Sequence, residues 1–271
     1  MTTSLAARAL HNREQILRMG SSPSGTHIGG SLSCVDVLTL LYDEILNVRP
    51  DEPDWPLRDR FVLSKGHASA ALYAVLASAG FIPESEVDTY AASGGRLAGH
   101  PLRRLPGVEF PSGSLGHGLS LGAGVALAAQ RLGHAYRTFV LMGDGELQEG
   151  SVWEAAQYAP AAGLDNLVAI VDRNGWQITG RTEELGLEPL ADRWRSFGWA
   201  TTEVDGHDLD ALREVFTLLE PGRPTAVIAR TVKGKGVPLF EDKKKSHHVT
   251  LTPALLTRAQ AGLRARARRT S

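Results

Sequence analysis

Short apolar runs alternate with amphipathic segments along most of this chain. The runs at Arg60–Leu63, Thr138–Met142, Leu167–Asp172 and Thr225–Ala229 have the length and residue content of buried strands. Strands separated by helical segments favour an α/β fold, with a mostly parallel sheet and helices on both of its faces. No linker rich in proline, serine or glycine divides the chain, so we expect one domain over residues 1–271.

Four segments have the spacing of apolar residues that is typical of helices. They are residues 33–45, 119–132, 151–160 and 208–219. Ser33 and Asp36 stand in capping-box spacing and predict where the first of these helices begins. Ser151 and Glu154 repeat that spacing and predict the start of the third. The glycine and alanine content of residues 119–132 predicts a helix that packs close to the sheet.

Composition and charge narrow the class of protein. With 271 residues and 42% hydrophobic content, the chain can bury one substantial core. Its net charge of −1 gives no reason to expect nucleic acid or a membrane surface as a partner. The single Cys34 cannot form an internal disulfide, and no apolar run approaches the ~18 residues of a membrane helix. Since the chain also lacks a signal-like start, we expect it in the cytoplasm.

Two basic stretches are interpreted as surface features. Residues 263–269 are rich in arginine, and we expect a solvated or frayed helix end there in preference to a nucleic-acid arm. Lys243–Lys245 are expected to lie in an exposed loop.

Candidate chemistry begins where two of the predicted strands end. The strand Thr138–Met142 runs into Gly143, Asp144 and Gly145, and the next strand is followed by Asn174. Open α/β sheets bind ligands at the carboxyl ends of their strands. A carboxylate and an amide oxygen from neighbouring strands suit magnesium, which prefers hard oxygen ligands and keeps phosphate oxygens in its shell. The sequence therefore predicts a magnesium diphosphate site.

Together, the two loops resemble the thiamine diphosphate and magnesium motif, and further segments in the same order resemble transketolases. These segments are Ser24–Ser31, Asp59–Ala68, Gly99–Pro101, Gly113–Gly118, Thr231–Val237 and Ser246–His248. The similarity runs from about His11 to about His248. It implies the thiamine diphosphate-binding fold, with thiamine diphosphate and Mg²⁺ as cofactors. The implied reaction moves a two-carbon ketol unit from a ketose donor to an aldehyde or related acceptor.

The resemblance also implies which residues hold the cofactor and the metal. Asp144, the Asn174 side chain and the carbonyl of Trp176 would bind Mg²⁺. The cofactor-binding residues would be His67, Gly113, Leu115, Gly143, Asp144, Gly145, Glu146 and Asn174.

Histidines are the implied catalytic residues. An unperturbed pKa near 6.5 allows an imidazole to donate or accept a proton near neutrality. By resemblance, His27 and His247 face the substrate, His67 contacts the diphosphate, and His100 contacts the hydroxyl of the two-carbon unit. His248 is an alternative to His247, whereas His207 is interpreted as a turn residue.

Glu149 resembles the family's acidic residue at the interface between active-site halves. We therefore include Glu149 among the predicted catalytic residues. The alternative is a first-turn helix acid that the helix dipole favours.

Full-length transketolases add a pyrimidine-binding domain and a third domain, and we expect neither in this sequence. We therefore expect the N-terminal subunit of a split transketolase, which assembles with a separate C-terminal subunit into a heterotetramer. Two alternatives are the α subunit of a 2-oxo acid dehydrogenase and a non-catalytic cofactor-binding subunit. Unusual residues for the family at Thr26, Ser114, His117 and Pro160 leave room for a specialised acceptor.

Overall fold

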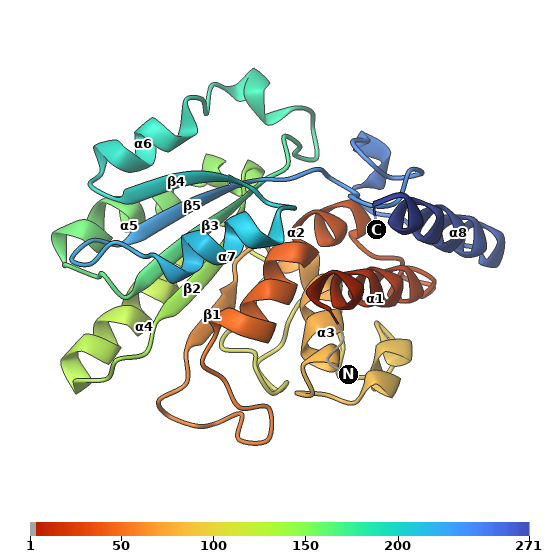
Figure 1. Cartoon of the computed structure of the whole chain (residues 1–271), viewed down its shortest axis with the longest axis horizontal. Coiled ribbons are helices and arrows are strands. Elements are labelled where there is room, and N and C mark those ends of the chain that lie inside the picture. Colours follow the sequence, from red (N-terminus) through yellow and green to blue (C-terminus); the bar gives the residue numbers. More distant parts are fainter. Residues whose placement is uncertain (1–3, 271) are drawn as a thin grey trace.

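Five parallel strands form one sheet in the computed structural model, which describes residues 4–270 (Figure 1). In chain order the strands are β1 (Arg60–Leu63), β2 (Thr138–Gly143), β3 (Leu167–Arg173), β4 (Ala200–Asp205) and β5 (Thr225–Arg230). They lie in the order β1-β2-β3-β5-β4. This confirms the predicted fold class and the four predicted strands. The sequence did not predict β4, because it is an edge strand whose residues are mostly polar and only partly buried.

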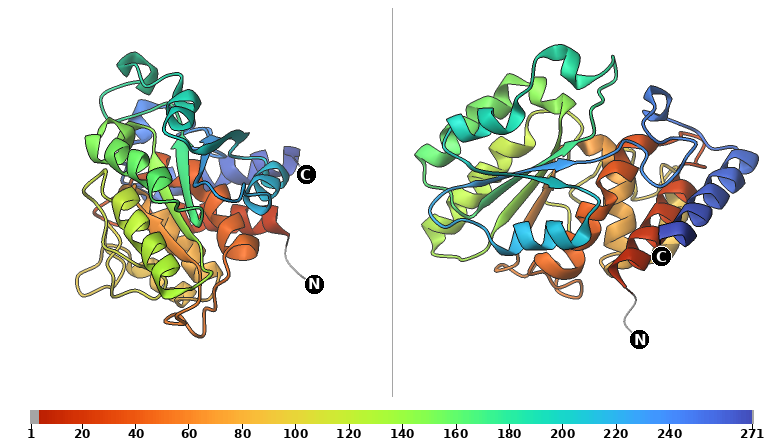
Figure 2. Two further views of the ribbon diagram at one scale, coloured as in Figure 1. Left: turned by 90° about the vertical axis from the view of Figure 1, so that its left-hand side faces the viewer. Right: turned by 45° about the horizontal axis from the view of Figure 1, so that its top comes forward.

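Eight α-helices surround this sheet in the described residues. They are α1 (Leu5–Met19), α2 (Ile28–Leu40), α3 (Ser69–Ser78), α4 (Gly118–Leu132), α5 (Gly150–Ala161), α6 (Leu190–Ser196), α7 (Leu209–Thr217) and α8 (Pro253–Thr270). Further views show α4, α5 and α6 on one side of the sheet, and α2 and α7 on the other (Figure 2). None of the helices in residues 4–270 is long and apolar enough to cross a membrane.

Both faces of the sheet are buried because successive side chains of each strand point to opposite sides. In β2, Phe139 and Leu141 join the core beneath α1, α2, α3 and α7. Val140 and Met142 join the core beneath α4, α5 and α6. This explains why the strands read as unbroken apolar runs.

Both capping-box predictions were wrong, although the helices exist. Helix α2 begins at Ile28, five residues before the predicted box, and Ser33 lies inside it, where its hydroxyl donates to Asp172. Helix α5 begins at Gly150, and the Ser151 hydroxyl donates to the carbonyl of Gly116. In both cases the serine hydroxyl that was expected to cap the helix donates its hydrogen bond to a residue far away in the sequence.

The predicted start of α7 is correct. The Asp208 carboxylate accepts hydrogen bonds from the backbone N–H groups of Asp210 and Ala211. The arginine-rich residues 263–269 belong to α8. This helix contacts α1, and Arg264 forms an ion pair there with Glu14. Lys243–Lys245 are exposed, in a loop and a short 3₁₀ turn.

Two glycines of α4 test how closely this helix approaches the sheet. A Cβ at Gly122 would lie 2.4 Å from Val140 Cγ2, whereas one at Gly124 would meet nothing within 4 Å. Gly124→Ala should raise the free energy of unfolding by up to about 1 kcal/mol through helix propensity. Gly122→Ala should lower it, since forcing atoms into a packed contact costs about 1–3 kcal/mol. Urea denaturation of both variants measures the difference, and equal effects would contradict this packing.

Candidate active site

The loops that follow β1, β2, β3 and β5 meet at the carboxyl edge of the sheet, beside the first turn of α2. A cavity of about 430 Å³ lies there. The sequence-predicted residues that line it are His27, His67, Leu115, Gly143, Asp144, Gly145, Glu146, Glu149, Asn174, Trp176 and His247. Gly113 and His100 are not among the lining residues: the His100 ring centroid lies 4.9 Å from that of His67, and a Cβ at Gly113 would lie 3.2 Å from the His100 ring. Segments far apart in sequence therefore converge as expected.

Asp144 ties the two predicted metal-binding loops together. Its side chain is buried, and one carboxylate oxygen accepts from the N–H of Gly145 at 3.0 Å. The other accepts from the N–H of Gly175 at 2.7 Å and from the Thr182 hydroxyl at 3.1 Å. Since Gly175 follows Asn174 directly, these bonds hold the Asp144 and Asn174 loops side by side.

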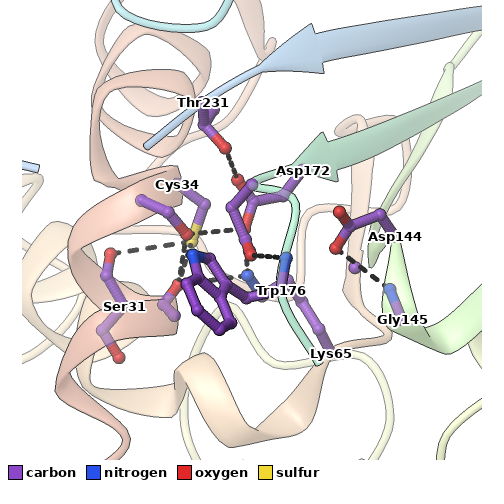
Figure 3. A network of polar contacts seen from close by, with 12 residues as sticks. Ser31, Cys34, Lys65, Asp144, Gly145, Asp172, Trp176 and Thr231 are labelled. Atoms are coloured by element: carbon purple, nitrogen blue, oxygen red, sulfur yellow. Dashed lines mark hydrogen bonds and ion pairs between the residues drawn. The ribbon is translucent and has the colours of Figure 1, made fainter. Parts of the chain in front are cut away.

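A second carboxylate, Asp172, lies near them at the end of β3 (Figure 3). It is fully buried and accepts hydrogen bonds from Ser33 at 2.6 Å, Asn174 Nδ2 at 3.0 Å, Thr231 and Lys65. Burial alone would raise the pKa of Asp172, but the ammonium of Lys65 holds it below its ordinary value. The network fixes the Asn174 amide, with its nitrogen turned toward Asp172.

These groups fit a magnesium ion that arrives with phosphate. Asp144, the Oδ1 of Asn174 and the Trp176 carbonyl are all hard oxygen donors. Burial and the nearby Asp172 carboxylate raise the pKa of Asp144 to about 6, a shift that a bound cation would oppose. Within residues 4–270, no three or more His, Cys, Asp or Glu side chains are arranged to hold a metal. Phosphate oxygens would therefore have to complete the coordination.

Glu146 lines the cavity, but its carboxylate is engaged within the protein. One oxygen accepts from the Ser64 hydroxyl and from the N–H of Gly116 at 2.9 Å, and the other accepts from the N–H of Gly143 at 3.1 Å. Burial raises the pKa of Glu146. The side chain thus joins the loops that carry Leu115 and the β2 end.

Four histidine rings gather around His27 on the other side of the cavity. Their centroids lie 4.7 Å (His67), 4.8 Å (His248), 5.2 Å (His247) and 6.3 Å (His100) from that of His27. His247 lines the cavity, whereas His248 is exposed. The sequence left the choice between these two open, and both flank His27.

Burial keeps the imidazoles of His27, His67 and His247 neutral. Burial, followed by the neighbouring rings, lowers the pKa of His27 to about 3. Burial and Lys233 lower the pKa of His247 to about 4, while burial and His100 lower that of His67. Each of these three neutral rings can donate from one nitrogen and accept at the other near pH 7.

Glu149 is exposed at the rim of the cavity, where it is the N-cap residue of α5. His207 lies in the turn between β4 and α7, as interpreted, but its ring is engaged on both sides. Its Nδ1 lies 2.7 Å from Asp36, and its Nε2 accepts from the N–H of Val232 at 2.9 Å.

Sequence reasoning gave no role to four buried polar residues at the site, namely Lys65, Asp172, Thr182 and Lys233. A signal for Asp172 existed, because it is a carboxylate at the end of an otherwise apolar strand. Lys65 and Lys233 stand within segments that resemble transketolases but were given no role. Thr182 had no signal, since only folding brings it to Asp144.

Comparison with known proteins identifies the same family that the sequence motifs resemble. Residues 12–265 match the family "Transketolase, thiamine diphosphate binding domain". The chain is 46% identical to one of the subunits of the apulose-4-phosphate transketolase of Phocaeicola vulgatus, over 88% of this chain and 85% of that one. It is 43% identical to 6-deoxy-6-sulfo-D-fructose transketolase subunit SqwG of Clostridium sp., over 88% of each chain.

Solved structures of longer chains superpose on almost all of it. The transketolase of Leishmania mexicana matches with a TM-score of 0.92 at 27% identity, over 99% of this chain and 44% of that one. The transketolase of Campylobacter jejuni matches with a TM-score of 0.90 at 28% identity, over 99% and 46%. The chain therefore spans less than half the length of these two solved proteins.

Replacing Asp172 by asparagine should destabilise the protein strongly. The ammonium of Lys65, which is 7% exposed, would lose its ion-pair partner, and breaking a buried pair costs about 3–5 kcal/mol. Asp242→Asn is a matched control, because it breaks the exposed pair with Arg181 and should cost less than about 1 kcal/mol. Urea denaturation at pH 7.5 compares the two, and similar losses would contradict the central role of Asp172.

Stability should fall on acidification in a way that depends on His27. The unfolded chain protonates this residue near pH 6.5, whereas the folded protein keeps it neutral down to about pH 3. Wild type therefore loses up to about 1.4 kcal/mol per pH unit below 6.5 through this group, a loss that His27→Gln avoids. Denaturation of both proteins at pH 7.5, 6 and 5 should show the wild type falling faster. Parallel pH profiles would contradict a neutral His27.

Proposed function

This chain belongs to the transketolase family, whose thiamine diphosphate-binding domain it matches, and we propose that it is the N-terminal subunit of a two-component transketolase. Such an enzyme transfers a two-carbon ketol unit from a ketose donor to an aldehyde or related acceptor. The family and the transketolase type of activity predicted from the sequence are confirmed by relatives named as transketolase subunits, which match along most of their length. The observation that carries the proposal is the convergence of Asp144, Asn174 and the histidines on one cavity.

We assign the charged side of the cavity to the cofactor. Asp144, the Asn174 side chain and the Trp176 carbonyl would hold Mg²⁺, and His67 would contact the diphosphate. The glycines at 143 and 145 leave space for the phosphates to approach the backbone. Gly113 and Leu115 would lie against the aminopyrimidine. When bound, thiamine diphosphate supplies the carbon nucleophile for breaking and forming the carbon–carbon bond.

We assign three histidines of this region to the substrate. His27 and His247 would bind the carbonyl and hydroxyl groups and transfer protons to and from them, while His100 would hold the hydroxyl of the two-carbon unit. General acid–base catalysis by positioned imidazoles typically contributes about 10²–10⁴-fold in rate. The low pKa values of His27 and His247 support their assignment, because these two rings remain uncharged beside the lysines of the same cavity.

A separate C-terminal subunit with a pyrimidine-binding domain is the proposed partner, in a heterotetramer in the cytoplasm. Two findings support the partner: relatives of similar length are named as subunits, and the superposed transketolases are more than twice as long. Exposed Glu149, at the rim of the cavity, would meet another subunit there. Residues 1–271 would form one thiamine diphosphate-binding domain. Relatives named as transketolase subunits give no support to a 2-oxo acid dehydrogenase.

The test is an assay of ketol transfer with this chain, its partner, or both. Activity should require both chains, and Asp144→Ala should lower it by more than about 100-fold and abolish Mg²⁺-dependent cofactor binding in calorimetry. Asp192→Ala, a change in an exposed pair on α6, is the control and should leave both unchanged. Turnover by the chain alone would refute the need for a partner. Cofactor binding without turnover by the mixture would favour a non-catalytic subunit.

A further inference from the structure

His207 is a largely buried histidine to which the proposed chemistry gives no contact with a ligand. Its side chain is 9% exposed and lines a separate cavity of about 600 Å³. Both nitrogens of its ring are nevertheless engaged within the protein, and one of these contacts leads to the loop that forms a wall of the active-site cavity.

The two contacts of the ring determine where its proton lies. The backbone N–H of Val232 lies 2.9 Å from Nε2, and a backbone N–H can only donate. Nε2 is therefore an acceptor, and the ring proton lies on Nδ1, which donates to Asp36 at 2.7 Å. His207 thus bridges a carboxylate of α2 and the loop that follows β5.

Asp36 holds a second side chain that reaches the same loop. The guanidinium of Arg13 in α1 donates to both oxygens of this carboxylate, at 2.7 and 2.6 Å. Burial alone would raise the pKa of Asp36, but Arg13 and His207 hold it below its ordinary value. The Nε of Arg13 also donates to the carbonyl of Lys235 at 3.2 Å. One ionised carboxylate therefore orients both Arg13 and His207.

The turn before α7 is shaped to present His207 to this loop. The backbone N–H of His207 donates to the Asp205 carboxylate at 2.9 Å. The N–H of Gly206 donates to the carbonyl of Arg230 at 2.8 Å. A Cβ at Gly206 would lie 2.4 Å from Thr231 Cγ2, so the turn packs directly against the start of the loop.

These contacts fasten residues 232–235 at both ends. Val232 is bound through its N–H, and Lys235 through its carbonyl. Between these two residues, the side chain of Lys233 lines the active-site cavity. The position of this part of the cavity wall therefore depends on groups that belong to α1, α2 and the β4–α7 turn.

We propose that His207 is a positioning residue, which sets the place of residues 232–235 in the wall of the active-site cavity through its bond to Val232. This inference rests on the proposed function. The acceptor at Nε2 is the group that acts, while Asp36 orients the ring and Arg13 holds the far end of the loop. The role needs no contact between His207 and a ligand.

Calorimetry and kinetics with the assembled enzyme, at saturating Mg²⁺, test the bond to Val232. His207→Gln retains an acceptor near the place of Nε2 and should bind thiamine diphosphate within a few-fold of wild type. His207→Asn keeps a donor for Asp36 but is too short to reach Val232. Its dissociation constant should rise about 10-fold, and kcat/KM for ketol transfer should fall about 10–100-fold, because small displacements of positioned groups have effects of this size.

Thr39→Val is the matched control for a loss of stability. The buried Thr39 hydroxyl accepts from Asn12 Nδ2 at 2.9 Å, so this change also breaks a buried hydrogen bond between α1 and α2. It should lower the melting temperature and leave the dissociation constant of the cofactor unchanged.

Stoichiometry separates positioning from a purely structural role of His207. A structural role would reduce the fraction of protein that binds the cofactor, without changing the dissociation constant of the rest. That result, or wild-type affinity in His207→Asn, would overturn the proposal. Equal weakening in His207→Gln and His207→Asn would also overturn it, because the acceptor would then not be the group that acts.

Hydrogen exchange follows the same contact without a ligand. The amides of residues 232–235 should exchange faster in His207→Asn than in His207→Gln, Thr39→Val or wild type, because Val232 loses its acceptor. Exchange at the wild-type rate in His207→Asn would contradict the anchoring of the loop and overturn the proposal.

Arg13→Lys tests the other end of the loop, and it replaces His207→Asn if that variant does not fold. A lysine keeps a cation beside Asp36, but its single nitrogen cannot reproduce the fork that also reaches Lys235. The variant should bind the cofactor more weakly, and wild-type affinity would overturn the proposal. If wild type itself binds no thiamine diphosphate, the proposed function fails. If wild type binds and these variants bind equally well, this inference alone fails.

Discussion

The buried ion pair between Asp172 and Lys65 is the interaction on which the rest of the site depends. An ionised carboxylate in an apolar interior is tolerated only when its oxygens are matched by donors. Asp172 obtains them from Lys65 after β1, Ser33 in α2, Thr231 after β5 and Asn174 after its own strand. The hydrogen bonds to this one carboxylate therefore bring three loops and a helix to the same point. The cavity is the space that these segments enclose beside Asp144.

Charge is distributed around this cavity in an unusual way. Asp172 and Lys65 neutralise each other, whereas Asp144 and Lys233 have opposite charges and form no ion pair. A buried carboxylate and a buried ammonium that remain apart are both destabilised, as the raised pKa of Asp144 and the lowered pKa of Lys233 indicate. A carboxylate and an ammonium held apart in this way suit a ligand that itself carries charges of both signs. Preorganised charges of this kind need no rearrangement when the ligand binds.

The sequence was sufficient to predict what local pattern determines. The buried strands are apolar on both faces, so their ends could be located, and with them Asp144 and Asn174. Features decided by distant contacts could not be predicted in this way. Ser33 has the local signature of a helix cap but serves Asp172 from inside α2. β4 was missed because an edge strand need not be apolar.

Roles that depend on a partner were the most difficult to predict. The two lysines look alike in sequence, each beside a glycine in a segment with family resemblance, yet one is paired and the other is not. His207 fits a turn in sequence, but in the structure its ring bridges Asp36 and the backbone before Lys233. Only the three-dimensional arrangement separates these cases, because each depends on a residue more than twenty positions away.

The cavity thus has a charged half and a neutral half, and Lys233 lies between them. Near the strand ends, carboxylates and lysines provide fixed charges suited to phosphate and metal. Burial and the neighbouring rings lower the pKa of His27 and keep it uncharged, which suits a group that must exchange protons. The ammonium of Lys233 contributes to both halves, since it also lowers the pKa of His247.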